Sequence, residues 1–138
     1  MASITKNDIE DRFGIENVAL WSQMGNRQAT DNKKRIDESI VQGVAFVEDR
    51  FRCSKYALPL TGPSGLPAKV KDWMAKAAGI WLWENRGRRE GTEGEASKDA
   101  EMAATEAKIE QQIDSYLAGS RELPANLTTT GPSSPTVV

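Results

Sequence analysis

Hydrophobic residues between positions 36 and 51 recur with the period of an α-helix. They stand at spacings of four, four, three and four residues: Ile36, Ile40, Val44, Val47 and Phe51. Such spacings place side chains along one side of a helix. The pattern therefore predicts a long helix whose apolar stripe faces the core. A groove for a partner is the less common use of such a stripe.

A shorter amphipathic helix is predicted near the start of the chain. Thr5 suits the N-cap position, and Ile4 and Ile9 have the spacing of a hydrophobic staple. Gly14 suits the left-handed conformation that ends many helices, so the helix is expected to end just before it. A short further turn of helix is expected over residues 15–21.

Residues 56–67 interrupt the helical pattern with three prolines and two glycines. Because proline lacks an N–H and restricts the residue before it, this segment is predicted to be a loop. Pro67 fits the first position of the following helix, whose marked face consists of Val70, Trp73, Met74, Ala77 and Trp81. Ile80, Leu82 and Trp83 make its end apolar on nearly all sides. Such a helix is normally buried on several sides, so it is the expected centre of the fold.

A last helix is predicted after residues 84–97, a charged loop that holds three glycines. Ser97 can cap its start and Gly119 its end; its expected core-facing residues are Met102, Ile109, Ile113, Tyr116 and Leu117. Residues 120–138 are rich in Pro, Ser and Thr and are expected to be disordered or extended until they meet a partner. The predicted fold is all-α, a compact bundle of about four helices in residues 1–119 with an extended C-terminal tail in residues 120–138.

Composition places the chain among water-soluble globular proteins. It has 138 residues, of which 38% are hydrophobic and 28% charged, as in a single domain of modest size. The net charge of −2 gives no bulk attraction to nucleic acid or to an anionic membrane. No apolar run approaches the ~20 residues of a membrane span, and the N-terminus lacks the apolar stretch of a signal peptide. We therefore expect a cytoplasmic protein.

Much of enzymatic chemistry is excluded by two residue counts. The chain has no histidine and a single cysteine, Cys53, which removes Ser–His and Cys–His pairs, histidine bases and most zinc sites. Neighbouring carboxylates such as Glu48 and Asp49 stand among lysines and arginines, which is typical of surface charge. We assign no catalytic, cofactor-binding or metal-binding residue and expect a protein that is not an enzyme. Catalysis by carboxylates alone is the remaining enzymatic alternative.

Two basic clusters are candidate contact sites. The first, Arg86, Arg88 and Arg89, is interleaved with glutamates that cancel most of its field, so a solvated loop is the simpler interpretation than a contact with phosphates or carboxylates. The second surrounds a predicted helix start, where the helix dipole disfavours cations: Arg27, Lys33, Lys34 and Arg35. This placement makes the second cluster a candidate for contact with DNA.

Four tryptophans are many for so small a core. Trp81 and Trp83 cannot both face the same way on one helix. One of them is therefore a candidate for an interface, where tryptophan is enriched, and Trp83 is the one assigned.

Four segments, in order, resemble a family of small proteins of tailed phages: ITKNDIEDRFG, DRFRCSKYALPL, GLPAKVKDWMAKAAGIWLWENR and IEQQIDSYLAGSRELP. The resemblance is to Mu-type phage proteins, described as a domain of unknown function among head-morphogenesis genes, and to the broader group of head–tail connector (head-completion) adaptors. It covers roughly residues 4–124. Its motifs are an RFG near the start, a Y-x-L-P-L after the second helix and a closing helix that ends in glycine. The charged loop over residues 87–95 departs from the pattern.

The resemblance implies an all-helical adaptor that forms a ring of about twelve subunits beneath the portal. Implied partners are further copies of the chain, the portal protein, a downstream neck or tail-completion protein and the genomic DNA passing through the channel, with no membrane. The protein would be assembled in the host cytoplasm and reside in the virion neck. Its C-terminal extension would pack on the portal or a neighbouring subunit, through Leu123, Pro124, Leu127, Pro132, Pro135, Val137 and Val138. A small helical DNA-binding packaging accessory protein is the alternative.

Overall fold

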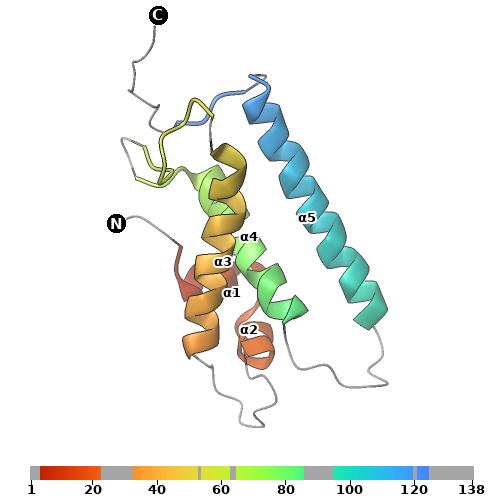
Figure 1. Cartoon of the computed structure of the whole chain (residues 1–138). Helices are drawn as coiled ribbons and strands as arrows, with labels where there is room; N and C mark the ends of the chain where they lie inside the picture. Colours follow the sequence, from red (N-terminus) through yellow and green to blue (C-terminus); the bar gives the residue numbers. More distant parts are fainter. Residues whose placement is uncertain are drawn as a thin grey trace, which may run out of the picture.

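The computed structural model describes residues 4–22, 33–52, 54–62, 65–85, 95–119 and 121–124. The described chain holds five α-helices and no strand (Figure 1): α1 Lys6–Phe13, α2 Ile15–Ser22, α3 Lys33–Phe51, α4 Ala68–Glu84 and α5 Glu95–Leu117. The all-α prediction is confirmed. The helices number five rather than about four because residues 15–22 form a complete helix of two turns, where the sequence indicated a short turn.

The start and the end of α1 are as predicted. The backbone N–H of Thr5 donates to Asp8 Oδ2 at 2.8 Å, and Ile4 and Ile9 on either side of this cap are both buried. Gly14 ends α1 at φ +96°, a conformation that costs glycine little. This sharp end lets α2 turn back toward the core.

Helix α4 is the centre of the molecule. Ten of its seventeen residues are buried, from Val70 through Trp83, and α1, α2, α3 and α5 all pack against it. The prediction that this helix lies at the centre and is buried on several sides is confirmed. Pro67 lies one position earlier than expected, at the N-cap.

Helix α3 crosses α4 at very short range. A Cβ atom placed on Gly43 would lie 2.5 Å from the carbonyl oxygen of Met74 and 2.8 Å from the backbone nitrogen of Ala78. Only a residue without a side chain lets the two backbones approach this closely.

The buried face of α3 is therefore displaced from the predicted stripe. Ile36, Val47 and Phe51 are buried as expected, but the centre of the contact is taken by two small residues, Ser39 and Gly43. Ile40 and Val44 lie at its edge, partly buried. They pack against the core as predicted but are not at its buried centre, because close packing against α4 favours small residues along the line of contact.

Helix α5 stands along the far side of α4 from α1 and begins at Glu95, two residues before the predicted cap at Ser97. Met102, Ile109, Ile113 and Tyr116 are buried as predicted. Leu117 is 40% exposed, so its assignment to the core was wrong. One residue beyond Tyr116 on a helix of 3.6 residues per turn already points away from the contact.

Candidate functional site: an apolar face of α3 and a neighbouring groove

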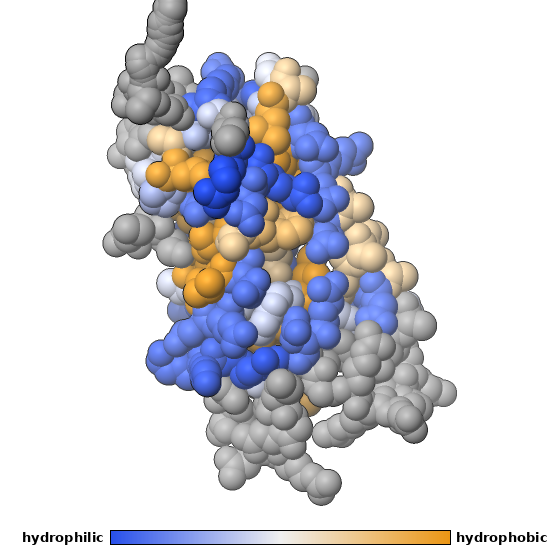
Figure 2. Space-filling model, viewed as in Figure 1, coloured by the Kyte–Doolittle hydropathy of each residue, from blue (hydrophilic) through white to orange (hydrophobic). Residues whose placement is uncertain are grey.

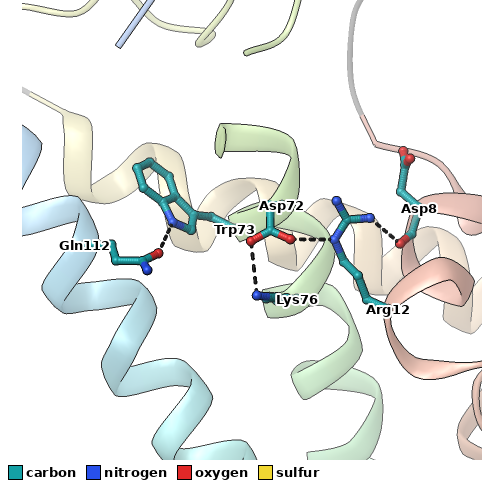
Figure 3. A network of polar contacts seen from close by, with 6 residues as sticks. All are labelled: Asp8, Arg12, Asp72, Trp73, Lys76 and Gln112. Atoms are coloured by element: carbon teal, nitrogen blue, oxygen red, sulfur yellow. Dashed lines mark hydrogen bonds and ion pairs between the residues drawn. The ribbon is translucent and has the colours of Figure 1, made fainter. Parts of the chain in front are cut away.

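A polar network joins three helices (Figure 3). Arg12 of α1 donates from Nε to Asp72 Oδ1 at 2.9 Å and from Nη1 to the Asp8 carbonyl at 2.8 Å. Lys76 Nζ lies 3.1 Å from Asp72 Oδ2. On the other side of α4, Trp73 Nε1 donates to Gln112 of α5 at 2.9 Å. These contacts help to fix the positions of the three helices relative to one another.

The charge of Asp72 is stabilised within this network. Burial by itself would raise the pKa of Asp72, but the hydrogen bonds and charges of Arg12 and Lys76 together lower it below the ordinary 3.8. The carboxylate is therefore ionised and paired at neutral pH, which is the state of a structural ion pair.

An apolar face of α3 lies open to solvent. Val41 is 64% exposed, and it shares a shallow hollow with Ile40, Val44 and Ala45. Charged residues edge the hollow: Glu48, Asp49 and Arg52. Figure 2 shows hydrophobic residues reaching the surface between bands of hydrophilic ones on the side of the molecule that α3 occupies. We call Ile40, Val41, Val44 and Ala45 the α3 face.

A second hollow, the inter-helix groove, opens beside it. Residues of α3 and α5 form its sides, and residues of α4 form its floor. Nine residues line it: Gln42, Ala45, Phe46, Asp49, Ala77, Ile80, Trp81, Glu84 and Glu106. The groove combines an aromatic and aliphatic surface with three carboxylates. Such a mixture of apolar and charged groups is typical of a surface that receives a side chain carrying both kinds of group.

One carboxylate of the groove, Glu106, has a raised pKa. Burial raises the pKa of Glu106, and the nearby charges of Glu84 and Glu110 raise it further, while Arg50 opposes them. Arg50 also forms an ion pair with Glu110. The raised pKa means that the charged form of Glu106 is less favoured than that of a free glutamate.

Arginines already stack on the two aromatic rings of the groove. The guanidinium carbon of Arg50 lies 4.9 Å from the Phe46 ring centre, and that of Arg35 lies 5.0 Å from the Trp81 ring centre. Both are within the range of a cation–π contact.

The two tryptophans at the end of α4 have distinct environments. Trp83 is 7% exposed, donates from Nε1 to Asp99 Oδ1 at 2.6 Å and meets the Trp21 ring edge-on at 5.4 Å. It is a core residue of this chain, and its assignment as a surface anchor needs correction. Trp81 is the partly exposed tryptophan of the two and lines the groove.

The described members of the second basic cluster are largely engaged within the chain. Lys33 pairs with Asp37 at 2.7 Å, and Arg35 donates to the Asn85 carbonyl at 2.7 Å besides covering Trp81. Lys34 is exposed. The other basic candidates, Arg27, Arg86, Arg88 and Arg89, lie outside the described residues.

The start of the predicted tail packs on its own chain. Leu123 is buried in the core, and its N–H donates to the Tyr56 hydroxyl at 3.0 Å. The packed part of the chain thus continues past the expected boundary at residue 119, and Leu123, assigned to an interface from the sequence, is a core residue of its own chain. Pro124 is exposed. The remaining tail candidates lie outside the described residues: Leu127, Pro132, Pro135, Val137 and Val138.

Sequence reasoning did not find the α3 face or the groove. Val41 could have been noticed, because it is a large aliphatic residue beside the predicted stripe. For Glu106 the local sequence shows only the neighbouring charge of Glu110, because its burial and the charges of Glu84 and Arg50 come from the packing of α3 and α4 against α5.

Comparison with protein-family models gives no match for this sequence. No curated protein matches it either. In the described part of the chain, no helix is long and apolar enough to cross a membrane, and no group of three or more potential metal ligands occurs.

Proposed function

We propose that this protein is a structural head-to-tail adaptor of a tailed-phage neck, which forms a ring beneath the portal. The observation that carries the proposal is the α3 face, an apolar surface with a charged edge on a helix fixed rigidly against the centre of the fold. An apolar centre with a polar rim is the usual anatomy of a protein–protein interface. The resemblance to connector proteins is the reason for proposing a phage neck as the assembly.

Further exposed aliphatic residues extend the surface available for contacts. On α2, Ile15 is 67% and Leu20 57% exposed. A stable contact usually buries about 800 Å² on each partner, more than the α3 face offers. We therefore expect each subunit to use two surfaces, as a head-to-tail ring requires.

The mass of the protein alone and with its portal tests the proposal, by mass photometry and light scattering. Wild type is expected to form a multi-subunit species, either free or on the portal. Val41→Asp should shift that species toward monomer, because it places a charge in the centre of the contact. Leu117→Asp, an exposed leucine on α5, is the matched control and should assemble as wild type does.

Two results would oppose the proposal. A wild-type chain that remains monomeric both alone and with a portal would exclude a ring adaptor. Equal assembly of wild type and Val41→Asp, with unchanged circular dichroism, would exclude the α3 face as the contact.

The alternative, a DNA-binding packaging accessory protein, has less support from the geometry. Lys33 and Arg35 both have partners within the chain, which reduces the number of cations available to phosphates. Affinity for DNA that falls steeply with salt would favour this alternative.

A further inference from the structure

We propose that the inter-helix groove binds an arginine side chain, presented between apolar residues by a segment of a partner protein. This goes beyond the adaptor proposal, and it holds whether or not the chain forms a ring. Three features of the groove lead to it: its carboxylates, its aromatic rings and its aliphatic floor.

Two carboxylates of the groove, Glu84 and Glu106, are able to accept hydrogen bonds from a cation. Within the described chain, no ion pair joins Glu84 or Glu106 to a basic side chain, whereas the other groove carboxylate, Asp49, is paired with Arg52 at 2.8 Å. Glu84 comes from α4 and Glu106 from α5, so they approach the groove from two helices. A cation placed between them would relieve the repulsion that they and Glu110 create.

The rings favour arginine over lysine. Phe46 and Trp81 line the groove, and the guanidinium groups that this chain itself places over them, Arg50 and Arg35, show that these rings suit that group. A planar guanidinium stacks on aromatic surfaces and donates to carboxylates in a fork, which a lysine ammonium does not do.

The floor favours a segment with apolar residues on both sides of the arginine. Ala77 and Ile80 lie between the charged walls and can accept the methylene groups of the side chain and its neighbours. A metal ion is a poorer fit, since the described residues form no cluster of three potential metal ligands. A purely apolar segment is also a poorer fit, because it would bury the carboxylates without a partner.

The experiment uses two synthetic peptides, acetyl-Leu-Ala-Arg-Ala-Leu-amide and the same peptide with citrulline, a neutral isostere, in place of arginine. Binding is followed by NMR on the Trp81 indole N–H, assigned by loss of its signal in Trp81→Phe. The arginine peptide should bind at least about ten-fold more tightly than the citrulline peptide, as expected for charge-assisted hydrogen bonds.

Variants locate the site. The double variant Glu84→Gln/Glu106→Gln should remove most of the difference between the two peptides. The control variant is Glu101→Gln, which removes a carboxylate from α5, the helix that carries Glu106. The Glu101 side chain is 67% exposed, and this variant should retain the difference between the two peptides. Circular dichroism checks that both variants fold as wild type.

Three results would overturn the proposal. They are equal affinity for the two peptides, a difference that survives in Glu84→Gln/Glu106→Gln, and no binding up to roughly 10 mM peptide. If binding appears only in Arg86→Ala/Arg88→Ala/Arg89→Ala, the groove is occupied by its own chain, which also overturns an intermolecular role. None of these measurements depends on ring formation, so a failure here is distinguishable from a failure of the adaptor proposal.

Discussion

Replacing Gly43 by alanine tests the contact on which the fold depends. The new Cβ would lie 2.5 Å from the Met74 carbonyl oxygen, 2.8 Å from the Ala78 nitrogen and 2.9 Å from the Ala78 Cβ. Two of these three atoms are backbone, so no rotamer change can relieve the clash and α3 must move away from α4.

The expected loss of stability follows from two opposing effects. Overpacking a tight contact costs about 1–3 kcal/mol, and a clash with backbone belongs at the upper end of that range. Alanine in place of glycine within a helix raises the free energy of unfolding by roughly 0.5–1 kcal/mol. The free energy of unfolding should therefore fall by about 2 kcal/mol, which lowers the melting temperature by about 5–10 °C for a chain of this size.

Urea unfolding followed by far-UV circular dichroism gives the measurement. Gln42→Ala, an exposed neighbour on the same helix, controls for helix propensity and should change stability by less than about 0.5 kcal/mol. Ala78→Gly combined with Gly43→Ala should not restore wild-type stability, because the two backbone contacts remain. If Gly43→Ala is as stable as wild type, α3 and α4 do not approach as closely as described, and the explanation of the displaced stripe is refuted.

Two further substitutions test the polar contacts. Tyr56→Phe should cost about 1–2 kcal/mol in urea unfolding, because it leaves the buried N–H of Leu123 without an acceptor; an unchanged stability would mean that Leu123 does not pack as described. Asp72→Asn should cost about 1 kcal/mol at pH 7, where Arg12 and Lys76 pair with the carboxylate. Because the pKa of Asp72 is lower in the folded state than the ordinary 3.8, its stabilisation is complete above that value and is lost as the pH falls through the lowered pKa. The wild type and Asp72→Asn should thus converge in stability near pH 2, and a difference independent of pH would contradict this assignment.

Local sequence determined much of the helical framework. The N-cap at Thr5, the end of α1 at Gly14, the proline-rich interruption before α4 and the glycine end of α5 were all predicted correctly. These features depend on backbone conformation and hydrogen bonds within a few residues, so nearby residue types are sufficient to predict them. The central position of α4 was likewise readable, because apolar residues cover most sides of this helix.

The tertiary structure alone decided which residues stand at the centre of each contact. A hydrophobic period defines a side of a helix, but the row of side chains that meets the neighbour depends on how closely the neighbour can approach. Ser39 and Gly43 let α4 approach, and this leaves Ile40 and Val44 at the edge and Val41 in solvent. The candidate interface exists for that reason.

Packing between helices also decides the surroundings of the groove and of the two tryptophans. Trp81 and Trp83 are equally apolar in sequence, and only the packing of α2 and α5 against α4 buries Trp83 and leaves Trp81 in the groove. Glu106 acquires its raised pKa from burial and from charges on other turns and another helix. Composition and period determine that this chain is helical and how its helices begin and end. The α3 face and the inter-helix groove arise from contacts between residues far apart in sequence, which no local pattern encodes.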